Sequence, residues 1–452
     1  MRLVLLLLTT LLTPTPAPAG VTTTEVSFSG SGGLAMHGTV VAPAGATSPT
    51  PGLVLVHGAG SGSPRTKLMG EAVEFARRGL SVLVYDKRSE GYSIFERSYS
   101  TLADDAIGAI GALRGQKGVD PAKVGIWGLS EGGWVAPLAA TRSADIKFVV
   151  VVGANGLAPL RQQTWAVAAG LRKAGVAGPL VDRAEPTLYR QVSAGGLFGE
   201  PYHDAEGVLR QVKQPVLAIW GTKDLLTPPQ ESPPIFARAL THGHYSLRYF
   251  AGADHAAHQS PDGGVTRLPE LAPGYADTVG TWVKDVAAGK LPMRDAPAAL
   301  PTQPSFSIPV PPPSWWEGPV VQVAALLVFL VGFLGYPVWA LARRVRGRSA
   351  TVVRTARVVS AGGLVAVLGS MGYVMFLVMT GGKLATPGPM LGSRPLVWLA
   401  LQALAVAVVV ATALTVRGWR RSQGSERVRL SLLITAGALF APWALYWGLL
   451  LP

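Results

Sequence analysis

Four long apolar segments near the C-terminal end restrict the fold of this chain more than any other feature. They cover residues 319–342, 358–380, 395–416 and 430–451, and none of them contains a charged residue. A helix of about 20 apolar residues is long enough to cross the hydrocarbon core of a bilayer. Four such segments in a row are not expected inside a soluble protein. We therefore expect residues 319–452 to form four transmembrane helices.

Arginines in the connections between these segments predict how the helices are oriented. Segments 343–357 and 417–429 contain eleven arginines and one acidic residue, Glu426. The connection between the second and third apolar segments contains only two basic residues, Lys383 and Arg394. Connections rich in arginine and lysine remain in the cytoplasm. This pattern predicts a multi-pass protein of the cytoplasmic membrane, with everything before the first span on the extracytoplasmic side.

The N-terminal residues support the same orientation. The sequence begins MRLVLLLLTTLLTPTPAPAG, with a positive charge at Arg2, a short apolar run and then small residues and prolines. The run is shorter than a membrane span, and the Ala17-x-Ala19 pair is typical of a cleavage site before Gly20. We expect residues 1–19 to be a signal peptide, with an uncleaved anchor as the alternative.

The composition excludes several other classes of protein. The two arginine-rich segments supply +10 of the formal net charge of +14, so the rest of the chain offers no basic surface for nucleic acid. The sequence has no cysteine, which excludes disulfides, thiolate nucleophiles and cysteine-ligated metal sites. No nucleic-acid partner is expected.

Between residues 20 and 290, short apolar runs alternate with stretches of helical length. The expected strands are 52–60, 80–86, 123–130, 147–155 and 215–224, and helix-length stretches occupy 67–78, 100–115 and 131–142. Continuous apolar runs are typical of strands that are buried on both faces of a parallel sheet. Strand–helix alternation predicts an α/β fold whose functional residues lie at the carboxyl ends of the strands.

A serine between two glycines lies at one of these strand ends. Gly128-x-Ser130-x-Gly132 follows an apolar run and precedes a helical stretch. This is the context of a nucleophile elbow, a sharp strand-to-helix turn that exposes the serine hydroxyl at the helix N-terminus. An ordinary tight turn with a capping serine is the alternative, unless partners for the serine exist.

Such partners occur in the chain order Ser, Asp, His. Asp224 and His255 each follow a predicted strand, and the histidine of such a triad takes the serine proton while the carboxylate orients the imidazole. Asp254 and His258 are the nearest rivals, but Asp254 adjoins the histidine and is badly placed to orient it. Structural or surface roles are expected for His37, His203, His242 and His244.

The loop that begins His57-Gly58 supplies the remaining part of the predicted site. The backbone N–H groups of Ala59 and Glu131 are the expected oxyanion hole. A dinucleotide-binding fingerprint would need glycine where Ser63 stands, and no Gly-Lys-Ser/Thr completes a phosphate-binding loop. These nucleotide-binding alternatives are therefore excluded, and we expect no organic cofactor and no metal.

Two segments do not belong to the regular alternation. Residues 157–213 are too many for one crossover connection, so we expect an inserted helical cap over the site. Its candidate pocket residues, for each of which packing of the cap against the core is the equal alternative, are Trp165, Leu171, Leu188, Tyr189 and Phe198. Residues 291–318 are rich in proline, and we expect an extended, semi-rigid linker there.

These motifs together resemble secreted bacterial α/β-hydrolases of the esterase and dienelactone-hydrolase-like kind. The stretch YDKRSEGYS at 85–93 is similar to one found in that group, although Ser89 replaces the usual glycine, and GLSEGG matches its elbow. The resemblance implies that Ser130 is the nucleophile, Asp224 the acid and His255 the base. It covers about three-fifths of the chain and does not extend to the four apolar segments.

The sequence as a whole predicts a membrane-tethered extracytoplasmic serine hydrolase. The first hypothesis is an esterase that forms an acyl-enzyme on a small or lipid-like acyl ester. The same residues also suit a serine peptidase or a thioesterase. A different class of function stays open, namely a non-catalytic envelope or lipid-binding membrane protein with a hydrolase-like head. The sequence does not predict the oligomeric state or the protein partners.

Overall fold

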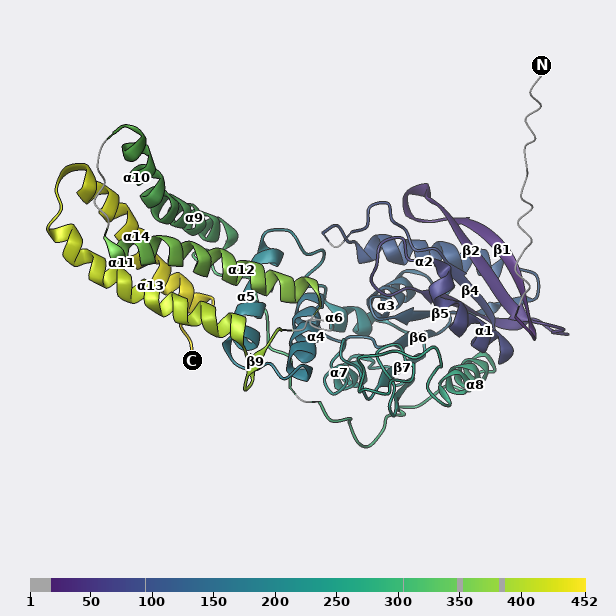
Figure 1. Ribbon diagram of the computed structural model, residues 1–452. Coiled ribbons are helices and arrows are strands. Elements are labelled where there is room, and N and C mark those ends of the chain that lie inside the picture. Colours follow the sequence, from purple (N-terminus) through teal and green to yellow (C-terminus); the bar gives the residue numbers. More distant parts are fainter. Residues whose placement is uncertain (1–17, 94, 304, 348–352, 382–386) are drawn as a thin grey trace, which may run out of the picture.

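The computed structural model describes residues 18–93, 95–303, 305–347, 353–381 and 387–452. The predicted signal peptide, residues 1–19, lies almost entirely outside the described residues. An α/β part and a bundle of long helices lie at opposite ends of the molecule, and the helices α4 and α5 lie between them (Figure 1).

An eight-stranded sheet forms the centre of the α/β part. Its strands are β1 (Val21–Ser29), β2 (Ala35–Pro43), β3 (Thr50–Val56), β4 (Ser81–Tyr85), β5 (Val119–Leu129), β6 (Val149–Val152), β7 (Val216–Gly221) and β8 (Tyr245–Phe250). Their order is β1-β2-β4-β3-β5-β6-β7-β8. The pairs β1–β2 and β2–β4 are antiparallel, and all pairs from β4 to β8 are parallel. Because adjacent parallel strands end at the same edge, the loops after β3 to β8 converge there.

Helices cover both faces of this sheet. Within β3, Leu53 and Leu55 belong to one buried apolar cluster, whereas Val54 and Val56 belong to another, as the twofold alternation of a strand requires. The first cluster includes side chains of α1 (Met69–Arg77) and α8 (Tyr275–Ala287). The second includes α2 (Tyr99–Arg114), α3 (Gly132–Arg142), α6 (Ala205–Gln211) and α7 (Ser232–Ala239). The predicted α/β-hydrolase fold is confirmed.

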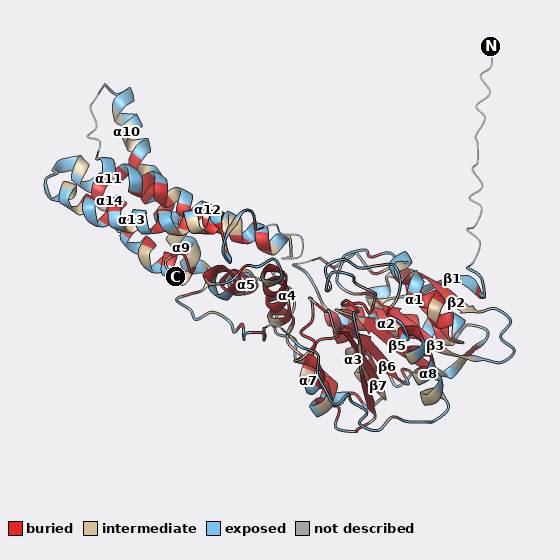
Figure 2. Cartoon of the chain, turned by 60° about the horizontal axis from the view of Figure 1, so that its bottom comes forward, coloured by how far each residue is buried: buried red, intermediate tan, exposed pale blue. Residues whose placement is uncertain are grey.

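The segment between β6 and β7 is helical. It contains α4 (Pro159–Lys173), a π-helical turn (Leu180–Ala184), α5 (Glu185–Ala194) and the α6 already described. We call residues 159–194 the cap. Apolar side chains of the cap are buried in one cluster with the C-terminal helices and not with either face of the sheet. In Figure 2 the helices α4 and α5 are largely buried, at the junction of the two parts.

The C-terminal part consists of four helices that are long and apolar enough to cross a membrane, as is expected of a multi-pass membrane protein. We call them the bundle. Their elements are α9 (Pro319–Phe329) and α10 (Gly335–Val345), α11 (Arg354–Arg357) and α12 (Gly363–Met379), α13 (Leu396–Arg420), and α14 (Gly424–Tyr446). The π-helical turns Leu330–Leu334 and Val358–Gly362 join the halves of the first two helices. A short hairpin of two two-residue strands, β9 (Met390–Leu391) and β10 (Arg394–Pro395), precedes α13.

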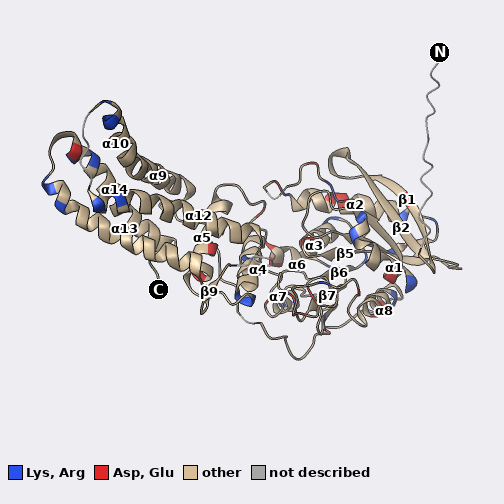
Figure 3. Cartoon of the chain, viewed as in Figure 1, with Lys and Arg blue, Asp and Glu red and all other residues tan. Residues whose placement is uncertain are grey.

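The charges of the bundle gather at one end. Arg343 and Arg344 lie in the last turn of α10, Arg417 and Arg420 in the last turn of α13, and Glu426 in the first turn of α14. Figure 3 shows these charges at the end of the bundle that is farthest from the sheet. The helices therefore continue into the arginine-rich connections, beyond the apolar segments from which they were predicted.

The proline-rich segment 291–318, for which an extended, semi-rigid linker was predicted, contacts both the sheet and the cap. Asp295 forms main-chain hydrogen bonds with Tyr245 (3.0 Å) and Leu247 (2.8 Å) of β8, so the α/β part reaches beyond the predicted boundary at 290. We call residues 296–318 the strap. Its Val310 is buried in the cluster that contains the cap. Proline cannot donate a backbone hydrogen bond, but neighbouring residues such as Asp295 can. These bonds attach the segment to the sheet, which its composition alone did not predict.

Candidate active site

Ser130 lies directly after β5, at the edge where the parallel strands end. Its φ angle is 57°, a left-handed conformation that is strained for a residue with a side chain. The Ser130 N–H donates to the carbonyl of Val152 at 2.9 Å, and its own carbonyl accepts from the N–H of Gly133 at 2.8 Å. These bonds fix the turn between β5 and α3, which is the geometry of a nucleophile elbow.

The glycines on either side of Ser130 make this turn possible. A Cβ atom on Gly128 would overlap the carbonyl of Gly132, and one on Gly132 would lie 2.6 Å from the carbonyl oxygen of Val56 in β3. Any side chain at either position would therefore push α3 away from the sheet. The spacing in the sequence has a direct steric cause.

Asp224 and His255 meet in front of this edge, after β7 and β8. The Asp224 Oδ2 atom lies 2.9 Å from His255 Nδ1, and both side chains are buried. The other oxygen, Oδ1, accepts from the backbone N–H groups of Leu226 (2.7 Å) and Thr227 (2.8 Å). These main-chain donors keep the carboxylate in one orientation, so that it holds the imidazole in one orientation as well.

The second ring nitrogen of His255 has no partner. Nε2 is buried and accepts or donates no hydrogen bond within the described residues, so it is not bonded to Ser130 in this structure. Hydrogen bonds between catalytic groups are often long in the absence of substrate. With Nδ1 committed to Asp224, Nε2 is the nitrogen that remains available for a proton.

Gly153, directly after β6, makes room for this histidine and was not identified in the sequence. Its φ angle is 55°, and a Cβ atom there would lie 2.7 Å from His255 Nδ1. Its carbonyl also accepts from the Thr227 hydroxyl at 2.8 Å. The only signal in the sequence is a glycine that ends an apolar run, which many loops share.

The two rival residues have other partners. Asp254 Oδ1 accepts from the backbone N–H groups of Ala256 (2.9 Å) and His258 (3.0 Å), and Oδ2 pairs with Arg267 at 2.5 Å. His258 Nε2 lies 3.2 Å from Glu71. Burial opposes protonation of His258, but Glu71 outweighs this effect and raises its pKa. Both rivals therefore fix the loop that carries His255.

The loop after β3 lies against Ser130. A Cβ atom on Gly58 would be only 3.3 Å from the Cβ atom of Ser130. The backbone N–H groups of Ala59 and Glu131 donate no hydrogen bond to any described residue. Glu131 is also the N-cap of α3, where the helix dipole favours negative charge. These are the two donors that the sequence predicts for an oxyanion hole.

His57 has a structural role beside this loop. Its Nε2 atom lies 2.8 Å from the carbonyl oxygen of Tyr85, at the end of β4. Burial lowers the pKa of His57 to about 4. The ring is therefore neutral at pH 7, and Nε2–H donates to Tyr85, which joins the ends of β3 and β4.

Three side chains surround the carboxylate of Glu131. Lys87 Nζ lies 2.5 Å from Oε1, the Tyr92 hydroxyl is within 2.9 Å of both oxygens, and Arg97 Nε is 3.2 Å from Oε2. Burial lowers the pKa of Lys87 although Glu131 opposes this, and burial together with Glu131 raises the pKa of Tyr92. The sequence places Lys87 and Tyr92 in a family motif but does not predict this contact.

The cap contacts the loops that flank the site. Gln162 of α4 donates to the carbonyl of Leu226, two residues after Asp224. After α5, the Glu200 carboxylate accepts from the N–H of Tyr99 at 2.7 Å. The first contact joins the cap to the loop after Asp224, and the second joins the segment after the cap to the start of α2.

Most of the predicted pocket residues of the cap do not face the site. Leu171, Leu188 and Tyr189 are buried in the cluster shared with the bundle, and the Trp165 indole donates to the Ser305 carbonyl of the strap at 2.9 Å. Phe198 also packs against this cluster, and its ring centre lies 5.8 Å from the guanidinium of Arg97. A hydrophobic residue suits both a substrate pocket and the packing of the cap, so the sequence could not distinguish these two roles.

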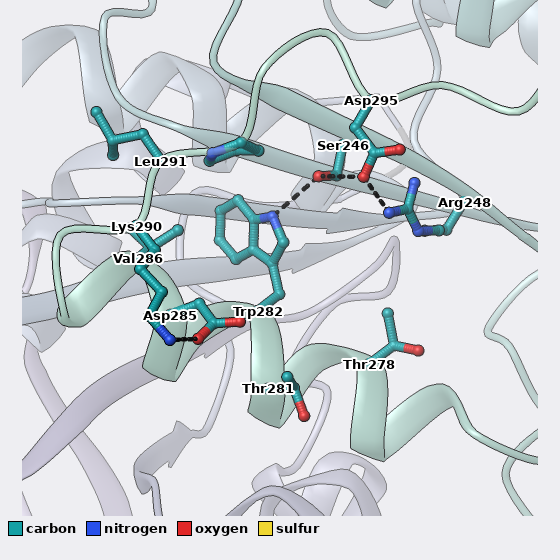
Figure 4. Close-up of a pocket in the computed structure, with 11 residues that line it drawn as sticks. Ser246, Arg248, Thr278, Thr281, Trp282, Asp285, Val286, Lys290, Leu291 and Asp295 are labelled. Atoms are coloured by element: carbon teal, nitrogen blue, oxygen red, sulfur yellow. Dashed lines mark hydrogen bonds and ion pairs between the residues drawn. The ribbon is translucent and has the colours of Figure 1, made fainter.

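A surface pocket of about 320 Å³ lies elsewhere, between β8 and α8. Figure 4 shows Trp282 in this pocket, with its indole N–H directed to the Ser246 hydroxyl at 3.2 Å and with Arg248 paired to Asp295. None of the candidate site residues lines this pocket. Among the described residues, no three His, Asp or Glu side chains are grouped so that they could hold a metal ion.

Comparison with known proteins finds matches to parts of the chain. Residues 93–270, less than half of the chain, match the model of the prolyl oligopeptidase family. Two curated proteins match shorter stretches: the polyketide transferase claH of Penicillium crustosum is 37% identical over 86 residues, and the thiohydrolase aneE of Aspergillus aculeatus is 32% identical over 106 residues. These stretches are 18% and 23% of this chain and about a third of each relative, 28% and 33%.

Among solved structures, the chain is similar to the esterase Pf2001 of Pyrococcus furiosus. The identity is 17%, the TM-score is 0.40, and the match covers 58% of this chain and 92% of the esterase. Ser130, Asp224 and His255 all lie within the segment that matches the prolyl oligopeptidase family. The strand order of the sheet and the match to the prolyl oligopeptidase family both indicate an α/β-hydrolase fold, and the family match supports a hydrolase.

Proposed function

We propose that this chain is a membrane-tethered serine hydrolase that cleaves carboxylic esters through an acyl-enzyme on Ser130. Asp224 is the orienting acid, His255 the general base, and the N–H groups of Ala59 and Glu131 form the oxyanion hole. The observation that carries the proposal is the pairing of Asp224 with His255 at 2.9 Å, together with a serine held at φ 57° on the strand-to-helix turn at the same edge of the sheet. No cofactor takes part in this reaction.

The reaction has two halves. In the first, Ser130 Oγ attacks the ester carbonyl while His255 Nε2 takes the hydroxyl proton, and Asp224 stabilises the imidazolium that results. The tetrahedral oxyanion accepts hydrogen bonds from the two backbone N–H groups. Collapse breaks the ester bond, and His255 gives its proton to the leaving alkoxide. In the second half, water attacks the acyl-enzyme with His255 as base, which releases the acid and restores Ser130.

The distribution of charge supports placement of the hydrolase part on the extracytoplasmic side. The arginines of the bundle lie at the end that is farthest from the sheet (Figure 3). The opposite helix ends, such as that of α14, contact the cap, since Gln191 of α5 donates to the Tyr446 hydroxyl at 2.9 Å. If the arginine-rich end is cytoplasmic, as is usual, the cap and the sheet lie outside the cytoplasmic membrane.

Peptide bond cleavage is the second candidate. It is favoured by the match of residues 93–270 to the prolyl oligopeptidase family. The thiohydrolase relative extends the candidates to thioesters. One triad serves all three reactions, because they share the tetrahedral intermediate and differ in the leaving group. The choice among them depends on the groups around the acyl and leaving-group positions.

Labelling with a membrane-impermeant fluorophosphonate tests the proposal directly. The probe is applied to intact cells and to lysed cells that express either the wild type or Ser130→Ala. We expect the wild type to be labelled in both preparations and the variant in neither. Purified wild type should then hydrolyse a panel of p-nitrophenyl esters faster than matched thioesters or dipeptidyl anilides.

Each departure from this result has a distinct meaning. Labelling of the wild type only after lysis would retain the hydrolase and overturn the proposed orientation. Equal labelling of Ser130→Ala would show that another residue is the nucleophile. Absence of labelling in both preparations would contradict the hydrolase mechanism and favour the non-catalytic, envelope-binding alternative. Faster cleavage of the anilides would make the chain a peptidase.

A further inference from the structure

The Lys87 ammonium connects the two sides of the proposed oxyanion hole. Its Nζ atom donates to the carbonyl oxygen of Gly58 at 2.8 Å and to the Glu131 carboxylate at 2.5 Å. Gly58 precedes Ala59, and Glu131 follows Ser130. One buried cation is therefore bonded to both segments that carry the proposed oxyanion donors.

Peptide geometry turns the contact with Gly58 into an effect on Ala59. The Gly58 carbonyl and the Ala59 N–H belong to the same planar, trans peptide group, so they point in opposite directions. When Lys87 fixes the carbonyl on one side, the direction of the N–H on the other side is fixed too. A cation on the carbonyl oxygen also polarises the peptide, which makes the N–H a stronger donor.

The side chain of Glu131, the residue that carries the second proposed oxyanion donor, is also fixed by hydrogen bonds. Lys87 and the Tyr92 hydroxyl, which lies 2.7 Å from Oε2, anchor the side chain of the residue whose N–H is the second donor. The same tyrosine also reaches the first loop, because its hydroxyl accepts from the N–H of Gly60 at 3.4 Å. The loop after β3 and the elbow thus share one buried polar network.

Stability alone does not account for this network. Lys87 and Glu131 have side chains only 4% and 1% exposed, and removing two such charges from water costs several kcal/mol. A well-packed apolar pair of the same volume is often at least as stable. The main-chain bond from the Lys87 N–H to the Ser63 carbonyl, 2.9 Å long, would hold this loop near position 87 with any residue other than proline there. The ammonium therefore has a role beyond attaching the loop.

We propose that Lys87 is a positioning residue that aligns the N–H groups of Ala59 and Glu131 on the oxyanion of the tetrahedral intermediate. The inference rests on the proposed acyl-transfer function. Lys87 does not touch the reacting atoms, and it acts through the Gly58–Ala59 peptide and the Glu131 side chain. Its loss should weaken binding of the transition state and leave binding of the ground-state ester largely unchanged.

The experiment compares Lys87→Met, which keeps the length of the side chain without its hydrogen bonds, with Lys87→Arg. Three quantities are measured on the purified full chain: kcat, KM for a p-nitrophenyl ester, and Ki for a trifluoromethyl ketone, which adds to serine and presents an oxyanion. Removing one oxyanion donor outright lowers kcat by about 10²–10³. For Lys87→Met we expect a loss of about 10–100-fold in kcat, an equal rise in Ki and an unchanged KM, with partial rescue by Lys87→Arg.

A merely structural role gives a different pattern. Loss of folded protein would lower the number of active sites, measured by fluorophosphonate titration, and leave kcat per site and Ki unchanged. If Lys87→Met does not fold because Glu131 loses one of its two cationic partners, Lys87→Met/Glu131→Gln removes both members of the Lys87–Glu131 pair and decides the matter. Wild-type kcat and Ki in a folded variant would overturn the inference. Failure of Ser130→Ala to abolish turnover would instead overturn the proposed function.

Discussion

The α/β part and the bundle bury polar groups in different ways. The α/β part buries charged side chains in pairs, such as Lys87 with Glu131 and Arg88 with Asp105. Within the apolar segments of the bundle, buried hydroxyls bond to main-chain carbonyls: Ser360 to Phe333, at 2.7 Å, is one example. Similar bonds are made by Ser370, Thr412 and Thr415. The buried Arg429, which pairs with Glu426, lies outside these segments, near the start of α14.

We relate this difference to the roles proposed for the two parts, catalysis for the α/β part and membrane attachment for the bundle. Charges that are fixed in a region of low dielectric interact strongly with a charge that develops beside them. Hydroxyls that bond to main-chain carbonyls of the same or a neighbouring helix satisfy their own hydrogen-bonding capacity, as is needed where no water is present. The cap, although it lies in the chain between two strands of the sheet, shares its apolar cluster with the bundle. The cap therefore packs with the bundle and not with the sheet.

The largest effect is expected for Asp224→Asn in the α/β part. An amide in place of the carboxylate would stabilise the wrong tautomer of His255, so kcat should fall by about 10³–10⁴. Asp254→Asn is the matched control, because Asp254 bonds to the same loop but not to the imidazole. Steady-state kinetics on one ester measures both variants. Equal losses would show that the loop, and not the orientation of His255, limits the reaction.

The next effect is a pH dependence confined to the α/β part, where all seven histidines lie. Burial lowers the pKa of His57 to about 4, below its unfolded value near 6.5. The unfolded chain thus binds more protons between these values, so the stabilising contribution is complete above pH 6.5 and is lost as the pH falls toward 4. The loss amounts to roughly 3 kcal/mol.

Thermal unfolding of the wild type and His57→Gln in detergent, at pH 7 and pH 4.5, measures this contribution. The difference between the two proteins should change with pH, whereas the unfolding of the bundle should not. His258 acts in the opposite direction, because its raised pKa makes the folded state the better proton acceptor above pH 6.5. A wild-type profile that persists in His57→Gln would assign the acid sensitivity to another group.

A smaller effect is expected from overpacking the bundle. A Cβ atom on Gly437 of α14 would overlap Thr412 of α13, whereas one on Gly372 of α12 would meet no atom within 4 Å. Gly437→Leu should lower the free energy of unfolding by about 1–3 kcal/mol, and Gly372→Leu should change it little. Because the cap shares the cluster of the bundle, Gly437→Leu should also lower kcat/KM. Unchanged kcat/KM in a destabilised bundle would show that the cap is held by the α/β part.

The smallest effect concerns the contact between cap and strap. Arg190 of α5 lies 2.8 Å from Glu317, and these side chains are 17% and 10% exposed. Arg190→Met should cost about 1–2 kcal/mol by leaving a buried carboxylate without its partner. Arg210→Met removes an exposed pair with Glu206 and should cost less than about 0.5 kcal/mol. Limited proteolysis within the strap should speed up in the first variant and not in the second.

Local pattern was enough to predict much of the fold. The strand ends that carry Ser130, Asp224 and His255, and the four long helices, follow from apolar runs whose length and period depend on neighbouring residues alone. The structure brings Asp224 to His255, and the assignment of the triad and of the oxyanion donors stays a prediction for the experiments above.

Other features depend on residues that are far apart in the chain. Lys87 and Glu131 are 44 positions apart, and no periodicity connects them. Gly153 looks like any loop glycine until His255 is placed beside it. Residues 291–318 were predicted to be an extended, semi-rigid linker, because their composition shows only that they form neither helix nor sheet, not which surface they contact.

The sequence by itself determined which segments become strands, which become long apolar helices, and where a serine is placed between them. The physical reason is that hydrophobic periodicity and the steric demands of glycine act over a few residues. Only the tertiary structure decided that the cap packs with the bundle, that the strap is pinned to the cap, and that one buried ammonium joins the two oxyanion segments. These outcomes depend on contacts between segments that are far apart in the chain. Burial and hydrogen bonding stabilise such contacts only after the chain has closed loops of tens to hundreds of residues.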